Sequence, residues 1–329
     1  MIKKRRYSVI AVLAAVMIAI TGCQSRTSSS EPSSSEASPS SSSSSEPEDT
    51  RPPYLFVNPL DPAGIIVPGI RPEEVETYDF TSTVTESRKI NTDVGAHLFI
   101  PDTRIDEPIL TSSQYSNGMA GLQAIYDKTS NRLNWKKEST GLGGYGVAYL
   151  HSRANINSRA ELSPNLVIFG HNNGMPYGQA YNASIPVKDL PDGAMFAQLY
   201  KFLDEEFATN HPYLFFSTEK ENYIYQVFAV YWTEADPTPP YWSSGIDQKD
   251  AVTVAKSAQE RSQWIYEDVE IKDTDRFLTL STCTYSFTTN LHAAESYRFV
   301  VQGRLLPEKA RLSATAKITK NPSPKQPQV

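Results

Sequence analysis

The segment RFLTLSTC, residues 276–283, predicts a short buried strand that ends on a cysteine. Its two leucines alternate with Thr279, Ser281 and Cys283, and a pleated strand sends alternate residues to opposite faces. We therefore expect the leucines to anchor the strand in the core. Thr279, Ser281 and Cys283 share the other face, and we expect that face to border an opening at the protein surface.

Cys283 is one of only two cysteines, and the other, Cys23, lies in what looks like an export signal. A mature exported domain with a single thiol cannot form an internal disulfide. Free cysteines are commonly small buried hydrophobic residues. An unpaired thiol outside the cell is nevertheless exposed to oxidation, which marks it as a candidate reactive group. From this residue alone, both interpretations stay open.

The N-terminus has the pattern of a targeting segment. Residues 3–6 are all Lys or Arg, and the apolar run of residues 9–20 is shorter than the roughly 20 residues that span a bilayer. The run ends in Ile-Thr-Gly-Cys, residues 20–23, which resembles the lipobox of bacterial lipoproteins and predicts lipidation of Cys23. An uncleaved signal anchor is the alternative. Either anchor places the rest of the chain on the extracytoplasmic face of the cell membrane.

The composition divides the chain into five parts. We expect a lipoprotein-type signal peptide at residues 1–23, a disordered Ser/Glu/Pro tether at 24–53, an N-terminal extension at 54–89, one domain at 90–306, and a disordered polar tail at 307–329. The formal net charge is −6, and no basic patch interleaved with aromatic residues appears. This pattern argues against nucleic acid as a partner.

Within the domain the predicted elements are mostly β-strands. Apolar runs bounded by turn residues predict strands at residues 96–100, 107–110, 146–150, 165–170, 213–217, 223–232, 276–283 and 298–305. Helical spacing predicts one helix from an N-cap at Asp192 to about Leu203 and another over residues 250–264. We expect a mostly antiparallel sheet with short helices outside, closed into a barrel because closure hides the sheet edges.

A thiol that attacks an amide carbonyl needs an adjacent base, which is usually histidine. The chain has five histidines: His97, His151, His171, His211 and His292. His171 directly follows the buried run of residues 165–170, so a rigid strand delivers its ring to a glycine-flanked rim. His292 is the second candidate, because it is near Cys283 in sequence. It lies in a long loop, however, which positions it poorly.

Amide cleavage also needs donors for the oxyanion that develops on the carbonyl. The backbone N–H of Thr284 is one candidate, and the guanidinium of Arg298, at the start of the last predicted strand, is another. Arg298 and Arg304 share a face of that strand. If the strand pairs antiparallel with the one that ends at Cys283, Arg298 lies almost opposite the thiol, and Arg304 lies roughly 20 Å further along.

Four segments of the chain resemble the sortases, most closely those of class B. They are NLVIFGHN (165–172), MFAQLYKF (195–202), LTLSTC (278–283) and YRFVVQGRL (297–305). Residues 95–110 are similar to the first strand pair of the family, and the helix-bearing insertion at 236–273 is the feature that points to class B. The similarity spans about residues 90–306. It implies a closed sortase-type β-barrel with short peripheral helices and this insertion before the cysteine strand.

The resemblance also assigns roles to individual residues. It implies that Cys283 is the nucleophile, that His171 is its acid/base partner, and that Arg298 is the third catalytic residue. It implies that Thr284 supplies a backbone oxyanion donor and that Ser281 lies along the groove for the sorting peptide.

The activity that the resemblance implies is transpeptidation by an enzyme of the cysteine-type peptidase class. Cys283 attacks the Thr carbonyl of a C-terminal sorting motif in an exported protein, and an amine then resolves the thioacyl enzyme. That amine comes from a peptidoglycan precursor or from a lysine of another surface protein. His171 protonates the leaving amine and later accepts a proton from the incoming one. We expect no cofactor, and the sequence shows no cluster of metal ligands.

The chain departs from the family pattern at several points. Asn173 stands where the family often has Met, and Thr284 stands where class B commonly has an acidic residue. The loop at 284–297 is longer than usual, which leaves the preferred motif open between the Asn-Pro-x-Thr type and another. A lipobox ending at Cys23 is also atypical, because most sortases keep an uncleaved anchor.

Two other classes of function stay open from the sequence. A secreted cysteine peptidase would hydrolyse peptides with the same Cys/His pair. A tethered binding lipoprotein without catalytic activity would need Cys283 to be buried and inert.

Overall fold

The computed structural model describes residues 54–56, 76–90, 92–111, 126–127, 136–137, 148–172, 174, 176, 187–193, 195–287, 296–308, 310 and 312–328. These residues all fall within one compact unit, Arg51–Val329. The predicted signal peptide and tether, including Cys23, lie outside the described residues, and so do Asn173 and His292.

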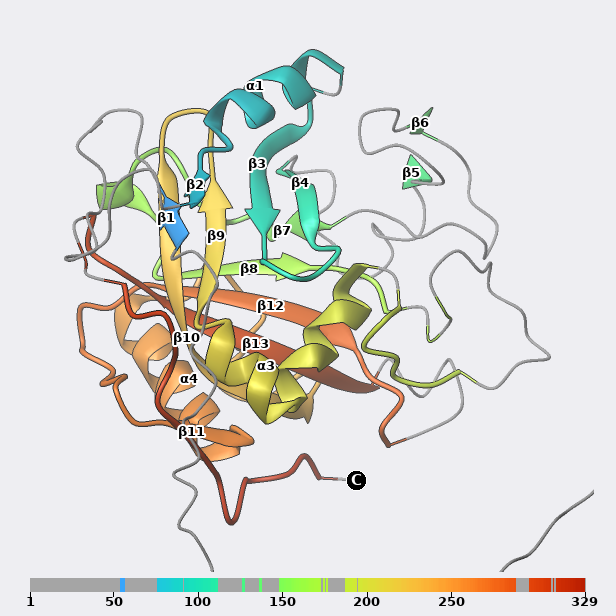
Figure 1. Ribbon diagram of the computed structural model, residues 1–329, viewed down its shortest axis with the longest axis vertical. Helices are drawn as coiled ribbons and strands as arrows, with labels where there is room; N and C mark the ends of the chain where they lie inside the picture. The colour runs from blue at the N-terminus through green and yellow to red at the C-terminus, as the bar shows by residue number, and fades with distance from the viewer. Residues whose placement is uncertain are drawn as a thin grey trace, which may run out of the picture. The chain divides into compact units, whose positions relative to one another are not determined.

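Eight of the described strands close into a barrel (Figure 1). They are β3 (Val94–Phe99), β4 (Asp106–Leu110), β7 (Tyr149–Leu150), β8 (Asn165–Phe169), β9 (Tyr213–Ser217), β10 (Asn222–Glu234), β12 (Phe277–Cys283) and β13 (Tyr297–Leu305). Their order around the barrel is β10-β13-β12-β8-β7-β4-β3-β9. The pairs β12–β8 and β4–β7 are parallel, and the others are antiparallel. The predicted closed and mostly antiparallel barrel is confirmed.

Short elements lie outside the barrel. Three two-stranded sheets pair β1 (Tyr54–Phe56) with β2 (Glu76–Tyr78), β5 (Tyr126–Asp127) with β6 (Lys136–Lys137), and β11 (Trp264–Tyr266) with β14 (Ile318–Lys320). The helices are α1 (Thr81–Ile90), α3 (Glu205–Asn210), α4 (Gln248–Arg261) and the 3₁₀ helices η3 (Arg159–Glu161) and η4 (Met195–Leu203). Within the part of the chain that the structure describes, no helix combines the length and apolar character needed to cross a bilayer.

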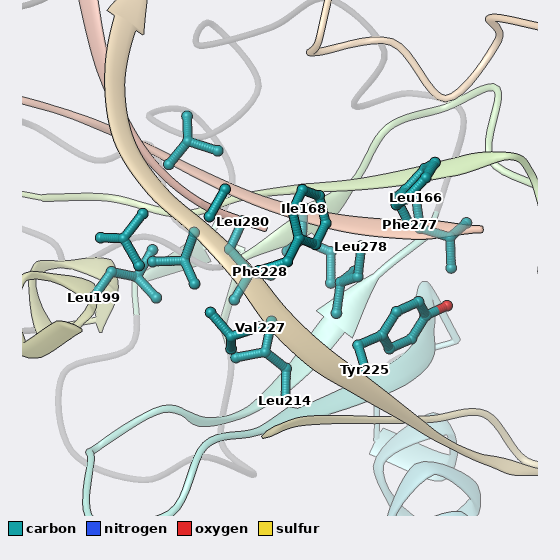
Figure 2. Close-up of a cluster of buried hydrophobic side chains, with 14 of the residues drawn as sticks. Leu166, Ile168, Leu199, Leu214, Tyr225, Val227, Phe228, Phe277, Leu278 and Leu280 are labelled. Atoms are coloured by element: carbon teal, nitrogen blue, oxygen red, sulfur yellow. The ribbon is translucent and has the colours of Figure 1, made fainter. Parts of the chain in front are cut away.

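The leucines of β12 anchor that strand in the core, as the alternation predicts. Leu278 and Leu280 are fully buried, and in the parallel register they face Leu166 and Ile168 of β8. Figure 2 shows these four side chains gathered with Val227 of β10 in one apolar cluster. Full burial of such a side chain is worth about 1.5–3 kcal/mol, so this cluster fixes both the position and the register of the strand that carries the thiol.

The opposite face of β12 is closed along most of its length, which corrects the prediction that Thr279 and Ser281 border an opening. The hydroxyl of Thr279 donates to Asn165 Oδ1 at 2.7 Å and accepts from Gln302 Nε2 at 2.8 Å. The hydroxyl of Ser281 lies 3.1 Å from Tyr241 Oη. The physical reason is the insertion after β10, which covers this face and is held there by a 2.8 Å bond from Asn165 Nδ2 to the Tyr241 carbonyl.

The helix predicted from an N-cap at Asp192 begins later and is a 3₁₀ helix, η4 (Met195–Leu203). Met195 has a φ of 51°, and a helix cannot continue back through this left-handed backbone to Asp192. The side-chain amide of Gln198 donates to the Gly193 carbonyl at 2.6 Å and holds the start of the helix instead. The second predicted helix is confirmed as α4, which ends at Arg261, and its predicted last residue, Trp264, begins β11.

The prediction that residues 307–329 are disordered is wrong for the described part of this tail. Strand β14 pairs antiparallel with β11, and Leu312 and Ala316 are buried. Further along, Asn321 Nδ2 donates to the Ser262 carbonyl at 2.8 Å. The tail is held at separate points, by apolar contacts of Leu312 with Tyr213 and Phe215 and by the pairing of β14 with β11. Such separate contacts need no continuous apolar face, which is why the tail lacks periodicity. The other predicted domain boundaries stay predictions.

Candidate active site

The thiol of Cys283 and the first arginine of β13 lie at paired positions on two neighbouring strands. Cys283 is the last residue of β12, and it pairs with Arg298, the second residue of β13, in an antiparallel register. Arg304 pairs with Phe277 at the far end of the same ladder. The antiparallel pairing that the sequence argument required is therefore confirmed, and of the two arginines only Arg298 lies beside Cys283.

The histidine lies on the other side of the cysteine. Strand β8 runs parallel to β12 with Phe169 opposite Ser281, and Gly170 continues the pairing by donating its N–H to the Ser281 carbonyl at 3.2 Å. The hydroxyl of Thr282 donates to the Gly170 carbonyl at 2.8 Å. Continued by one more residue, this register places His171 level with Cys283.

His171, Cys283 and Arg298 thus form a row across three adjacent strand ends, on the face that carries Ser281; we call these three the active-site row. Neighbouring strands are about 4.7–4.9 Å apart, so the backbones of the histidine and the arginine flank that of the cysteine at one strand spacing each.

Cys283 carries the only thiol among the residues that the structure describes, and it is partly exposed. His171 and Arg298 are also partly exposed, whereas Ser281 and Thr282 are buried. Strand β12 therefore reaches the surface only at its last residue. The binding-protein interpretation needed a buried, inert cysteine, and the exposure of Cys283 argues against it.

Three other histidines lie away from the active-site row in structural settings. His97 is buried with Nε2 at 2.7 Å from Asp106 Oδ1, and His211 is buried with Nε2 at 2.8 Å from Asp102 Oδ2. His151 accepts a backbone hydrogen bond through Nδ1. Of the histidines within the described part of the chain, His171 is the one that the topology places next to the thiol.

Two buried phenols share the electrostatic environment of the row. Burial raises the pKa of Tyr241 to about 12, the positive charge of Arg298 opposes that rise, and negative charge on Cys283 adds to it. Burial also raises the pKa of Tyr149, and the same two residues act on it with the same signs. Both phenols therefore stay neutral at physiological pH. The Tyr149 hydroxyl, moreover, has no hydrogen-bond partner among the described residues.

The two residues predicted to contact substrate are both buried. Ser281 is 1% exposed and lies under Tyr241, so it does not open onto a groove in this structure. Thr284 is fully buried, and its hydroxyl donates to Asp189 Oδ2 at 3.0 Å. Sequence analysis missed Asp189, because a single acidic residue between two loops has no pattern that separates it from an ordinary surface residue.

The arrangement fits nucleophilic acyl transfer. A partly exposed thiol, an imidazole and a guanidinium meet at the ends of rigid strands, which is the geometry that a nucleophile, its base and an oxyanion donor need. Over the described residues, no group of three or more His, Cys, Asp or Glu side chains is arranged to hold a metal ion.

Comparison with known proteins agrees with this chemistry. No family model matches the chain. Sortase B of Listeria monocytogenes is 28% identical over 221 residues, which cover 67% of this chain and 72% of that protein. The chain is thus similar to the class B sortases. Sortase B of Staphylococcus aureus is 24% identical over 206 residues, covering 61% of this chain and 68% of that protein. The crystal structure of Clostridium perfringens sortase B matches with a TM-score of 0.49 and 20% identity, over 68% of this chain and 99% of that chain.

Both sequence relatives are named sortase B, so the class B resemblance is confirmed. These relatives support a cysteine transpeptidase of the sortase type, and the alternative of a purely hydrolytic cysteine peptidase is not favoured.

Proposed function

We propose that this sortase cleaves a C-terminal sorting motif of exported proteins at a Thr carbonyl and transfers the acyl group to an amine. The observation that supports this proposal is the active-site row, in which the thiol lies between an imidazole and a guanidinium on three adjacent strands. The amine belongs to a peptidoglycan precursor or to a lysine of another surface protein. The enzyme belongs to the cysteine-type peptidase class.

The first half-reaction forms a thioester. The Cys283 thiol gives its proton to His171, and its sulfur bonds to the Thr carbonyl carbon. The carbonyl electron pair moves onto oxygen, where the Thr284 N–H and Arg298 stabilise it. The pair then returns, the C–N bond breaks, and His171 gives a proton to the leaving amine. In the second half-reaction the acceptor amine attacks the thioester carbon, His171 takes a proton from it, and the thiolate leaves. Ser281 lies beneath Tyr241 and takes no part in these steps.

The test uses the full chain, a library of Thr-containing peptides, and mass spectrometry with and without added triglycine. We expect cleaved peptide bonded to Cys283 and, when triglycine is present, a transfer product. Cys283→Ala should form no adduct. His171→Ala should lower turnover by about 10²–10⁴-fold. His292→Ala is the matched control, and we expect it to keep wild-type turnover. Wild-type turnover in Cys283→Ala would end the transpeptidase assignment, and a product that ignores added amine would favour hydrolysis.

We also propose that a lipid on Cys23 tethers the chain to the extracytoplasmic face of the membrane. The supporting observation is the sequence Ile-Thr-Gly-Cys at residues 20–23 after a short apolar run. Mass spectrometry of the membrane-bound protein should find a diacylglyceryl group on an N-terminal Cys23. Peptides that still contain Met1 in the mature protein would show an uncleaved anchor instead.

A further inference from the structure

Asp189 joins the two chain segments that leave the active-site row. Its Oδ2 accepts from the Thr284 hydroxyl at 3.0 Å and from the Ser286 hydroxyl at 2.8 Å. Both of its oxygens accept a hydrogen bond from the Tyr285 backbone N–H, each at 3.0 Å from the nitrogen. Its Oδ1 also accepts from Asn172 Nδ2 at 2.8 Å. All four donors come from the segments that directly follow the histidine and the cysteine of the row.

Asn172 links the same two segments a second time. It is buried, and its Nδ2 donates to the Cys283 carbonyl at 3.1 Å as well as to Asp189. Its own Oδ1 accepts from the Gly174 N–H at 3.1 Å. The Tyr285 hydroxyl donates to the Asn172 carbonyl at 2.8 Å. The residue after the histidine is therefore held against the backbone of the cysteine itself.

These side-chain bonds begin where the strand pairing stops. Strand β8 ends at Phe169, with one further backbone bond from Gly170 to Ser281, and strand β12 ends at Cys283. Residues 172 and 284–286 therefore lie beyond the paired parts of both strands. An ionised carboxylate has two oxygens with about four acceptor sites, and bonds to it are roughly twice as strong as neutral ones. Asp189 offers this acceptor at the point where both backbones leave the sheet.

We propose that Asp189 is a positioning residue for the transpeptidation reaction, an inference that rests on the proposed function. It fixes residues 284–286 against residues 171–172, and so keeps the Thr284 N–H and the His171 ring in place around the thiol. Because the Tyr285 N–H already donates to Asp189, the Thr284 N–H is the one left to face the oxyanion from this segment.

The test compares Asp189→Asn and Asp189→Ala with wild type in the full chain, using the library peptide that wild type cleaves fastest. Active enzyme is titrated as the amount of Cys283 that holds peptide as a thioester when no amine is added, measured by mass spectrometry of the intact chain. We expect kcat per titrated thiol to fall by about 10–100-fold, with KM nearly unchanged, because misplacement of reacting groups by about 1 Å costs up to about 10²-fold. Amide hydrogen exchange of residues 284–286 should be faster in both variants.

Asp192→Asn is the matched control, because Asp192 is exposed and close to Asp189 in sequence. We expect it to keep the wild-type kcat and exchange rates. A purely structural role for Asp189 would lower the number of titratable thiols and leave kcat per thiol unchanged, and that result would overturn the inference. Unchanged exchange at residues 284–286 would also overturn it. Inactive Cys283→Ala together with fully active Asp189→Ala would refute the positioning role alone, whereas active Cys283→Ala would remove the proposed function and this inference with it.

Discussion

Replacing the two arginines of β13 one at a time separates catalysis from stability within a single strand. Arg298 pairs with Cys283 in the ladder, and Arg304 pairs with Phe277. Six residues at about 3.3 Å each place the second arginine roughly 20 Å from the first along the strand. Surface charges interact weakly beyond about 8 Å at physiological ionic strength, so Arg304 has no electrostatic reach to the thiol.

We expect Arg298→Ala to lower kcat by about 10²–10³-fold, the usual loss when one oxyanion donor is removed. Arg298→Lys should recover only part of that loss, because an ammonium lacks the planar fork of the guanidinium. Arg304 donates to the Glu270 carbonyl and to Gln226 Oε1, each at 3.0 Å. We therefore expect Arg304→Ala to lower the unfolding free energy by about 1–3 kcal/mol and to leave kcat unchanged.

The assay measures kcat with one library peptide, normalised to titrated thiol, together with urea unfolding of each variant. Activity lost in Arg304→Ala and kept in Arg298→Ala would refute the assignment of Arg298. Equal losses in both would show that the effect comes from the strand as a whole and not from a donor at the carbonyl.

Two more predictions concern Gly170 and His151. A methyl group on Gly170 would overlap the Phe196 ring, so we expect Gly170→Ala to lower the unfolding free energy by about 1–3 kcal/mol and to lower kcat by moving His171. The double variant Gly170→Ala with Phe196→Ala should regain part of both losses. An unchanged kcat in Gly170→Ala would contradict this prediction. Burial and the Arg153 cation lower the pKa of His151 below 6.5 in the folded protein. The unfolded chain therefore binds a proton at His151 more readily than the folded protein does. The stability due to neutral His151 is lost as the pH falls below 6.5. Urea unfolding at pH 7.5 and pH 5 should show a smaller loss in His151→Gln than in wild type, and an equal loss would contradict the assignment.

The parts of the fold that follow from local patterns were predictable. Alternation along residues 276–283 placed the leucines in the core and left the thiol on the other face. The expected antiparallel pairing chose Arg298 over Arg304, because the two arginines are six residues apart on the strand. His171 was selected because a buried strand ends just before it.

The parts that depend on contacts between distant segments were not predictable. Tyr241 covers Ser281 across 40 residues of sequence, and Asp189 reaches Tyr285 across 96. Neither contact imposes a spacing or a composition on the residues nearby. The order of the C-terminal tail was missed for the same reason, since it depends on pairing with β11 and not on a pattern of its own.

The parallel pairing of β8 with β12 has a consequence for how the chain acquires its reactivity. The hydrogen bond from Thr282 to Gly170 spans 112 residues, so the histidine meets the cysteine only when a very long loop has closed. Contacts of such large sequence separation form slowly during folding. Until they form, the thiol has no imidazole beside it, and a partly folded chain is not yet a transpeptidase. Recovery of turnover during refolding therefore reports closure of the barrel, a step that the formation of individual helices does not reveal.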